Sequence, residues 1–348
     1  MKLTVAGENS TERLSLALGI PPVPLFETHL SFMRARAIMV ATKLGIFDAL
    51  EREPLLAKDV AQRCGTSPRA TEKLLNALAG CGYLRFRHGF YTLSAMAQKW
   101  LTCNSPSSLR DKLLFEFVEW SMVEGFEDFV RSGKSLDINY SFSDERMALY
   151  HRAMRALAGV VAPEVVRRTP MPKHAKSMLD IGGSHGYFSV SMCRRYPELH
   201  AAVFDLPTAV EHSAPILAKE GMGTRVVHQA GDALKDDLGV GIWDFVFVSQ
   251  LLHHFDEGGN QSLVKRVSRA LRPGGVLAVF EFIRPGSPEE AGQVGALLNL
   301  YFALTSQSGT WSIPEIRSWQ REAGLVPLKP IRLRKAPGAA VVAAVKGG

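Results

Sequence analysis

SMLDIGGSHGYFSV (residues 177–190) joins an apolar, strand-like run to a glycine-rich turn and then to the start of an apolar helix. In a sheet of parallel strands such a turn lies at the carboxyl edge, where the crevice for a nucleotide-like ligand opens. Glycines suit this place because a Cβ atom would keep the backbone from approaching a ligand closely. The stretch therefore predicts a doubly wound α/β domain with a ligand-binding turn.

Strand and helix patterns alternate on both sides of this stretch. Helical segments or loops separate the apolar runs, which predicts a mostly parallel sheet with helices on both faces. The tail VPLKPIRLRKAPGAAVVAAV (326–345) is typical of two strands joined antiparallel about Pro337–Gly338. The predicted parallel strands are SMLDIGG (177–183), AAVFD (201–205), RVVHQA (225–230), DFVFVS (244–249) and GVLAVFEF (275–282).

The N-terminal part, from about 25 to 101, has a helical pattern and ends in a predicted winged helix. Ser67 and Pro68 suit the N-cap and first position of a helix. The strand-like runs YLRF (83–86) and FYTL (90–93) follow it, and Gly89 between them allows a tight turn. A winged helix raises the possibility of DNA binding.

The composition of that helix argues against DNA recognition. A reading helix presents several Arg, Lys, Asn or Gln near its start, whereas this one offers Arg69 and Lys73 with Glu72 between them. The net charge of +7 is scattered and contains no basic run. We therefore expect a packing or dimerisation module and no nucleic-acid partner, while a winged-helix regulator stays an alternative.

The 348-residue length indicates about two domains, and the composition of 46% hydrophobic and 22% charged residues is that of a globular protein. The four cysteines form no CxxC pair, which favours a reducing compartment. The sequence contains no apolar segment long enough to span a bilayer and no signal peptide. A cytoplasmic protein without membrane association is expected.

Three kinds of site compete for the glycine turn. A dinucleotide site needs G-x-G-x-x-G, which residues 182–186 do not supply. A serine hydrolase is the second alternative, because 182–186 satisfies G-x-S-x-G around Ser184, and Asp244 and His253 follow in the order of that fold. The third is S-adenosylmethionine binding, for which Asp180, the turn and Asp205 at the next strand end form a coherent set. The third alternative is favoured.

A family resemblance supports this choice. The chain resembles the S-adenosylmethionine-dependent O-methyltransferases related to the plant caffeic acid and hydroxyindole enzymes, over nearly its whole length. The resemblance implies a homodimer formed through the N-terminal domain, for which ATKLGIFDAL (41–50) is typical. The motifs that carry it occur in order: DIGGSHG (180–186), FDLP (204–207), GD (231–232), LHHFD (252–256) and RPGG (272–275).

The same resemblance implies a cofactor site, with the glycines at the methionine end, Asp205 at the ribose and Asp232 beside the adenine. Ser184 and His185 depart from the family pattern of glycine followed by a small hydroxyl residue, and His185 adds bulk near a cationic sulfonium. The predicted cofactor-binding residues are Asp180, Gly182, Gly183, Gly186, Asp205, Leu206, Asp232, Ala233 and Ser249.

By resemblance, His253 is the catalytic base and Glu281 the carboxylate that orients it. The family's second carboxylate would precede an Arg-Thr pair, but residues 308–312 read SGTWS and contain no acid. O-methylation of a small aromatic molecule is the main prediction, with an N-, C- or carboxylate acceptor as the alternative. No metal site is expected, because adjacent strand residues such as His253 and His254 point to opposite faces.

Spacing alone leaves the acceptor site open, because the candidate residues fit helix packing equally well. The chain is divided into a winged-helix dimerisation domain (1–105), a helical segment contributing to the substrate pocket (106–170) and a catalytic domain (171–348). The predicted substrate-binding residues are Met154, Asn299, Phe302 and Trp311.

Overall fold

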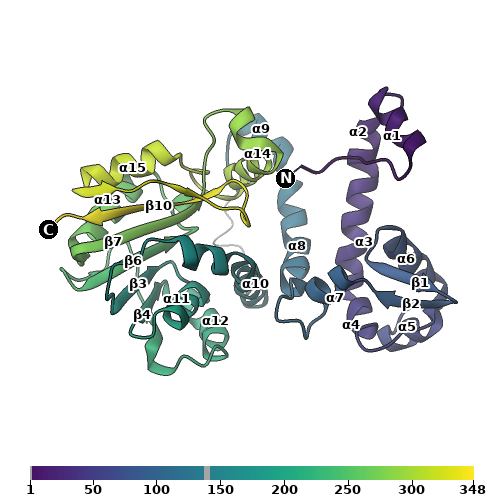
Figure 1. Cartoon of the computed structure of the whole chain (residues 1–348), viewed down its shortest axis with the longest axis horizontal. Helices are drawn as coiled ribbons and strands as arrows, with labels where there is room; N and C mark the ends of the chain where they lie inside the picture. The colour runs from purple at the N-terminus through teal and green to yellow at the C-terminus, as the bar shows by residue number, and fades with distance from the viewer. Residues whose placement is uncertain (1, 137–141) are drawn as a thin grey trace. The chain divides into compact units, whose positions relative to one another are not determined.

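The computed structural model describes residues 2–136 and 142–348 (Figure 1). The chain divides into two compact units, Lys2–Val118 and Glu119–Gly348. The division falls inside the segment 106–170. Among the described residues, no helix is both long and apolar enough to cross a membrane.

The first unit is mainly helical and carries a short hairpin. Its last helix, α8 (Arg110–Val123), continues across the boundary between the units. Its other elements are α1 (Ser10–Ala17), α2 (Val23–Leu25), the π-helix η1 (Phe26–Leu30), α3 (Ser31–Lys43), α4 (Ile46–Ala49), α5 (Ala57–Cys64), α6 (Pro68–Gly80), β1 (Leu84–Arg87), β2 (Phe90–Leu93) and α7 (Ala95–Leu101).

The predicted winged-helix hairpin is confirmed. β1 and β2 pair antiparallel with Arg87 opposite Phe90, so His88 and Gly89 form a two-residue loop. Both loop residues have positive φ, at 51° and 86°, as a tight hairpin turn requires. Ser67 is the N-cap of α6, as expected, but its side chain makes no capping hydrogen bond.

The second unit is an α/β domain built around one large sheet. The connecting helices and strands alternate from β3 to β7, as the sequence predicts. Its elements are α9 (Phe126–Ser132), α10 (Asp144–Arg168), β3 (Ser177–Ile181), α11 (Tyr187–Arg195), β4 (His200–Asp205), α12 (Pro207–Ala218), η2 (Gly223–Arg225), β5 (Val226–Ala230), β6 (Trp243–Ser249), η3 (Leu252–His254), α13 (Glu257–Ala270), β7 (Leu271–Phe282), α14 (Pro288–Thr305), α15 (Ile313–Glu322), β8 (Leu325–Pro327), β9 (Ile331–Arg332) and β10 (Ala339–Lys346).

The strand order is β5-β4-β3-β6-β7-β10-β8, and β9 also pairs with β10. Strands β3 to β7 run parallel, and β10 runs antiparallel to β7. The order reverses between β3 and β6, so the loops after these two strands diverge and leave room for a ligand. This confirms the doubly wound fold class.

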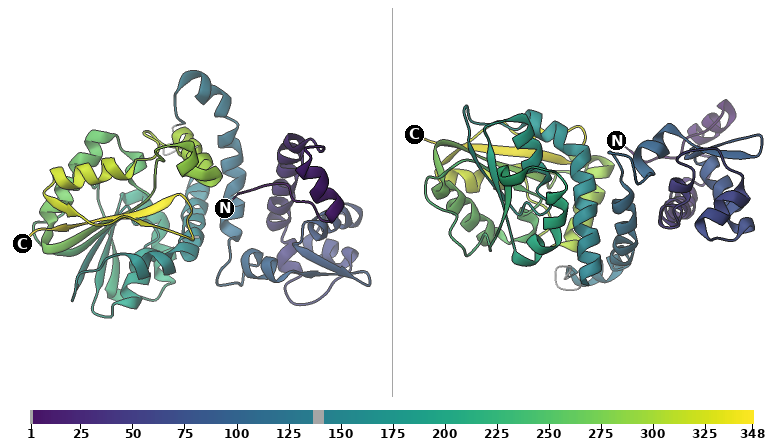
Figure 2. Two further views of the ribbon diagram at one scale, coloured as in Figure 1. Left: turned by 45° about the horizontal axis from the view of Figure 1, so that its top comes forward. Right: turned by 90° about the horizontal axis from the view of Figure 1, so that it is seen from below.

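Helices cover both faces of the sheet, with α10, α11 and α12 on one face and α13 and α15 on the other (Figures 1 and 2). Alternation along the buried strand β6 makes two cores. Phe245 and Phe247 pack with the α10–α12 layer, whereas Val246 and Val248 pack with the α13–α15 layer. The two cores fix the strand ends that carry the site.

The C-terminal tail differs from its prediction as two strands. The segment before Pro337 forms two short strands, β8 and β9, which pair with different parts of β10. Pro327 and Pro330 explain the division, because proline cannot donate a backbone hydrogen bond to a sheet.

Candidate active site

The glycine turn connects β3 to α11 and is anchored to the neighbouring strand, since Gly182 N donates to Phe204 O at 2.8 Å. Gly182 and Gly186 have φ of 68° and 69°, the left-handed conformation that favours glycine. At Gly183, a Cβ atom would lie 2.7 Å from Cγ of Asp180. The turn therefore has no room for larger residues at its close approaches.

Asp180 supports the turn from inside the fold. Its side chain is fully buried, Oδ2 accepts a hydrogen bond from Ser189 Oγ at 2.7 Å, and Oδ1 has no partner among the described residues. Burial raises the pKa of this carboxyl to about 7, against the opposing effect of the Ser189 hydrogen bond. The carboxyl of Asp180 thus bonds to α11, and its Cγ lies where a Cβ atom on Gly183 would point.

Asp205, at the end of β4, holds the turn from the adjacent strand. Its Oδ2 accepts from Ser184 N and its Oδ1 from Leu206 N, both at 2.8 Å. Burial raises the pKa of this carboxyl. Each carboxylate oxygen accepts more than one hydrogen bond, so two donors leave acceptor capacity for the hydroxyl groups of a ligand.

Ser184, at the centre of the turn, has a positive φ of 45°, which is uncommon for a residue with a side chain. Its Oγ lies 2.6 Å from His151 Nδ1 on α10, and its carbonyl oxygen accepts from His228 Nε2 on β5 at 2.7 Å. Together with the hydrogen bond to Asp205 on β4, these contacts hold Ser184 from three elements: β4, β5 and α10. These hydrogen bonds offset the backbone strain at Ser184.

The side chain of His185 packs and hydrogen-bonds inside the protein. It is buried, its ring lies beside that of Phe188, and its Nδ1 accepts from Tyr187 N at 3.0 Å at the start of α11. Burial first, and Arg155 second, lower the pKa of His185 to about 3. The imidazole is therefore neutral at pH 7 and adds no charge to the turn.

Three further predicted cofactor-binding residues lie after β5 or at the end of β6. Asp232 Oδ1 accepts from Leu234 N at 2.9 Å, and the hydrogen bond from Lys235 lowers the pKa of this carboxyl. The carbonyl of Ala233 accepts from Arg266 Nε at 3.1 Å. Ser249 ends β6 beside the turn that leads to the histidine pair. The parallel strands bring these residues to the same edge as Asp180 and Asp205.

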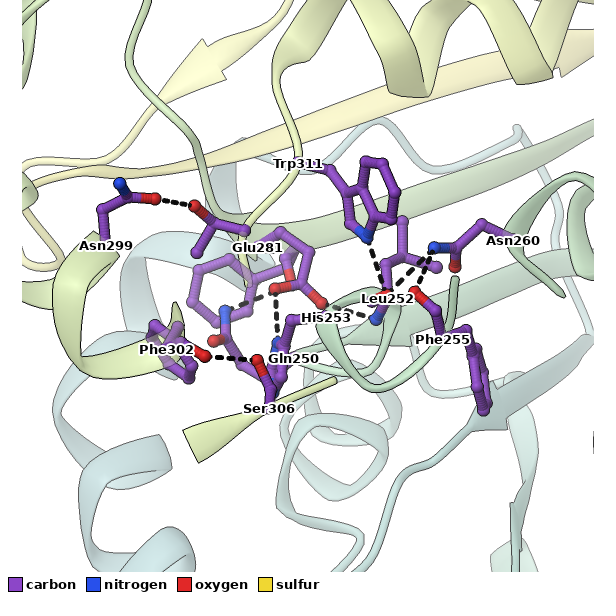
Figure 3. A network of polar contacts seen from close by, with 12 residues as sticks. Gln250, Leu252, His253, Phe255, Asn260, Glu281, Asn299, Phe302, Ser306 and Trp311 are labelled. Atoms are coloured by element: carbon purple, nitrogen blue, oxygen red, sulfur yellow. Dashed lines mark hydrogen bonds and ion pairs between the residues drawn. The ribbon is translucent and has the colours of Figure 1, made fainter. Parts of the chain in front are cut away.

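His253 and Glu281 form a buried pair at this edge (Figure 3). Nδ1 of His253 lies 3.1 Å from Oε2 of Glu281, and Oε1 of Glu281 accepts from Leu252 N at 2.8 Å. The exposed fractions are 4% for His253 and 1% for Glu281. The ring of His254 lies 4.3 Å from that of His253, and burial, followed by His253, lowers the pKa of His254 to about 3.

Two further side chains fix the backbone of η3. Trp311 Nε1 donates to Leu252 O at 2.9 Å, and Asn260 Nδ2 donates to the same oxygen at 3.0 Å (Figure 3). Trp311 is also packed edge-on against Trp319 at 5.0 Å between ring centroids. Trp311, predicted to contact substrate, thus contributes a polar bond that positions the segment carrying His253.

Of the other predicted acceptor-site residues, Phe302 lies next to His253. The ring of Phe302 on α14 lies 4.6 Å from that of His253, while Asn299 Oδ1 accepts a hydrogen bond from the buried hydroxyl of Thr310 (Figure 3). Met154 is half-buried on α10, one turn from His151. This neutral pair joins Asn299 on α14 to Thr310 in 308–312, the segment in which the resemblance implies a second carboxylate.

The serine hydrolase arrangement is not assembled. Ser184 is hydrogen-bonded to His151, and His253 to Glu281. Asp244 lies at the start of β6, where it accepts from Ser177 N at 3.0 Å and pairs with Arg272 at 2.8 Å. Asp244 and His253 therefore stand at opposite ends of the strand system, and the order of the three residues in the sequence matched by chance.

Sequence reasoning did not identify His151, His228 or Asn260. Asn260 lies on α13, His228 on β5 and His151 on α10, so no local motif connects them to the turn or to η3. The one available signal was the spacing of His151 and Met154 on one helix face. Within 2–136 and 142–348, no group of three or more His, Cys, Asp or Glu side chains is placed to hold a metal ion.

Two models of known protein families match the chain, each over a different range of residues. Residues 121–325 match the O-methyltransferase domain, and residues 26–103 match the O-methyltransferase dimerisation domain. The first match covers more than half of the chain.

Relatives of similar length carry related activities. Acetylserotonin O-methyltransferase of Mus musculus is 29% identical over 91% of this chain and 87% of its own. The 3-hydroxy-5-methyl-1-naphthoate 3-O-methyltransferase of Streptomyces sahachiroi is 25% identical over 94% and 98%. The solved structure of human N-acetylserotonin methyltransferase in complex with SAM superimposes with a TM-score of 0.81 at 22% identity, over 99% of this chain and 100% of that one. At this sequence identity, the structural similarity shows that the two proteins share a fold.

Proposed function

The chain belongs to the O-methyltransferase family, and from this premise we propose that it transfers a methyl group from S-adenosylmethionine to a hydroxyl group of a small aromatic molecule, with His253 as general base. Membership makes the protein a methyltransferase. The buried His253–Glu281 pair is the observation that carries the assignment of the base.

The residues of the turn fit the proposed cofactor. Gly182 and Gly183 let the turn pack closely on Leu251, Asp180 and Val203, and Asp205 retains acceptor capacity suited to ribose hydroxyls. Asp232, Leu206, Ala233 and Ser249 complete the proposed nucleoside-binding set along the same edge. Asp180 acts by supporting the turn. The cofactor supplies an electrophilic methyl group on a sulfonium.

Glu281 gives His253 the tautomer that a base requires. If Nδ1–H of the imidazole donates to Oε2 of Glu281, the unprotonated Nε2 is left to accept a proton from the acceptor hydroxyl. The carboxylate then stabilises the imidazolium that forms. Its second oxygen is held by Leu252 N, so the carboxylate cannot rotate freely.

Proton removal is best concerted with methyl transfer. A phenol of pKa about 10 and an imidazole of about 6.5 differ by roughly 3.5 units, so full deprotonation beforehand would cost about 5 kcal/mol. An attacking oxygen must be held roughly 3 Å from the methyl carbon and in line with the departing sulfur. The main task of the protein is therefore to position the acceptor.

An aromatic acceptor suits the surroundings of the base. Phe302 offers a ring next to His253, and the Asn299–Thr310 pair offers neutral polar groups. Met154 on α10 is a further proposed contact. The absence of an acid in 308–312 keeps a nitrogen acceptor as the second candidate.

The proposal is tested by transfer of a labelled methyl group from S-adenosylmethionine to a panel of hydroxyarenes and matched aminoarenes. We expect methyl ethers from the hydroxyarenes, and Asp205→Ala should raise the Kd of S-adenosylhomocysteine about tenfold or more. Products methylated only on nitrogen would favour the second candidate. No saturable binding of the cofactor product would overturn the proposal.

We also propose a cytoplasmic homodimer formed through the N-terminal region. Support comes from the match to the dimerisation domain at 26–103 and from large apolar side chains exposed there, including Phe32 and Met33, each 50% exposed. All four cysteines are unpaired, as in a reducing compartment. A mass of one subunit by light scattering would contradict the dimer.

A further inference from the structure

His151 is a buried imidazole that the proposed base chemistry does not use. It projects from α10 and is 3% exposed, and its Nδ1 lies 2.6 Å from Ser184 Oγ. Its Nε2 is buried and has no hydrogen-bond partner among the described residues. A buried polar atom without a partner is rare in folded proteins and is a reason to look for a ligand.

Either tautomer of the neutral ring leaves this nitrogen unsatisfied. Burial, followed by His212 and His228, lowers the pKa of His151 to about 4, so the ring is neutral at pH 7. If the Ser184 hydroxyl donates to Nδ1, Nε2 carries a proton that lacks an acceptor. If Nδ1 donates to the hydroxyl, Nε2 is a lone pair that lacks a donor. A zwitterionic ligand group can satisfy either form.

The position of His151 indicates which ligand group this is. Ser184 N is bonded to Asp205, the proposed ribose-binding acid, so His151 is two hydrogen bonds away from that carboxylate. Asp205 and Asp232 hold the nucleoside at the ends of β4 and β5 in the proposed function. The amino-acid substituent of the sulfur extends away from the ribose, and the proposed function puts it at the glycine turn, whose central residue, Ser184, contacts His151.

We propose that His151, held by Ser184, recognises the α-amino-acid end of the cofactor through Nε2. This rests on the proposed function and adds a positioning residue for the cofactor. This end of the cofactor carries an ammonium group and a carboxylate group. It therefore supplies both a charged donor and a charged acceptor. The bond would fix the tail of the cofactor and so limit the directions in which the sulfonium methyl points.

The binding of two nucleosides distinguishes this role of His151 from general structural support of the turn. S-adenosylhomocysteine carries the amino-acid end, whereas 5′-methylthioadenosine keeps the adenosine and the thioether without it. In the wild-type protein, calorimetry should show tighter binding of the first. His151→Phe should raise the Kd of S-adenosylhomocysteine about tenfold and leave that of methylthioadenosine within about twofold. His151→Gln, which retains a donor and an acceptor, should restore part of the loss.

Matched variants complete the test. Ser184→Gly removes the hydroxyl at a positive φ that glycine adopts readily, and should reproduce part of the selective loss. Asp205→Ala should weaken both nucleosides, because both carry the ribose. His200→Gln, at an exposed histidine at the start of β4, should change neither.

Three results would overturn the inference while leaving the cofactor site intact: equal weakening of both nucleosides by His151→Phe, no weakening of either, or a wild-type protein that binds both equally. A wild-type protein that binds neither nucleoside would instead remove the proposed function itself. Thermal melting of each variant identifies one that has failed to fold, and Ser184→Gly, which should also cause a selective loss, then replaces His151→Phe in the comparison.

Discussion

Nδ1 of His253 lies 3.1 Å from Oε2 of Glu281, although the residues are 28 positions apart. The relationship follows from the sheet, because β6 and β7 run parallel and pair Ser249 with Phe280 at their carboxyl ends. The pairing of these two strands therefore brings the proposed base and its carboxylate together.

Glu281→Gln should lower kcat about 10²-fold to 10⁴-fold. One oxygen of Glu281 faces Leu252 N–H and the other faces His253, so an amide cannot accept from both. If its NH₂ group turns to His253, it donates to Nδ1 and moves the ring proton to Nε2, where it blocks the base. Steady-state kinetics at saturating cofactor measure the effect.

The double variant His253→Ala/Glu281→Gln provides the control for this prediction. If the carboxylate acts through the histidine, adding Glu281→Gln to His253→Ala should cause little further loss of kcat. Multiplicative losses in the double variant would mean that Glu281 acts independently, and would count against its role as the orienter.

Gly183→Ala should destabilise the second unit and weaken cofactor binding. Its Cβ atom would lie 2.7 Å from both Asp180 Cγ and Val203 Cγ1, which are buried and cannot move freely. We expect a loss of about 1–3 kcal/mol in the free energy of unfolding, typical of overpacking. Gly258→Ala on α13 is the matched control, because its Cβ atom would meet only Asp256 Oδ1, at 3.7 Å. Equal melting temperatures for the two variants would contradict the tight turn.

His254→Gln should reduce the loss of the free energy of unfolding that occurs as the pH falls. Burial and His253 lower the pKa of His254 to about 3, whereas the unfolded chain titrates near 6.5. The unfolded state thus binds the proton more readily between these values. The contribution of His254 is fully present above about pH 6.5 and is lost toward pH 3, by about 1.4 kcal/mol per pH unit.

Denaturant unfolding between pH 4 and 6 measures this slope in the wild-type protein and in the variant. Asp180 acts in the opposite sense, because its pKa is raised to about 7 and the folded state holds its proton more tightly. The difference between the two proteins isolates His254, since Asp180 is common to both. Parallel curves would show that His254 is protonated in the folded state at these pH values.

Much of the α/β fold could be predicted from the sequence because its strands are short apolar runs with clear ends. The run that contains Asp180 and the run that ends at Asp205 become β3 and β4, and the turn at 182–186 lies where strand-helix alternation predicts it. His253 and Glu281 were paired through family resemblance, and the geometry brings them together. The tail was less predictable, because Pro327 and Pro330 divide what periodicity presents as one strand.

The polar contacts behind the turn could not be predicted. His151 and His228 reach Ser184 from α10 and β5, and such contacts depend on how layers pack and not on local pattern. His185 was expected to add bulk near the cofactor, yet its ring turns to the start of α11, where a backbone N–H needs an acceptor. The hydrogen bond from Trp311 to the carbonyl oxygen of Leu252 is likewise a tertiary contact that the sequence does not reveal.

The rate of methyl transfer by His253→Ala at saturating cofactor is the most direct test of the account. We predict a kcat lower by about 10²-fold to 10⁴-fold, with the Kd of S-adenosylhomocysteine changed by less than about twofold, because the imidazole acts on the acceptor proton. An unchanged kcat in a variant that binds the cofactor product normally would contradict a general base at position 253.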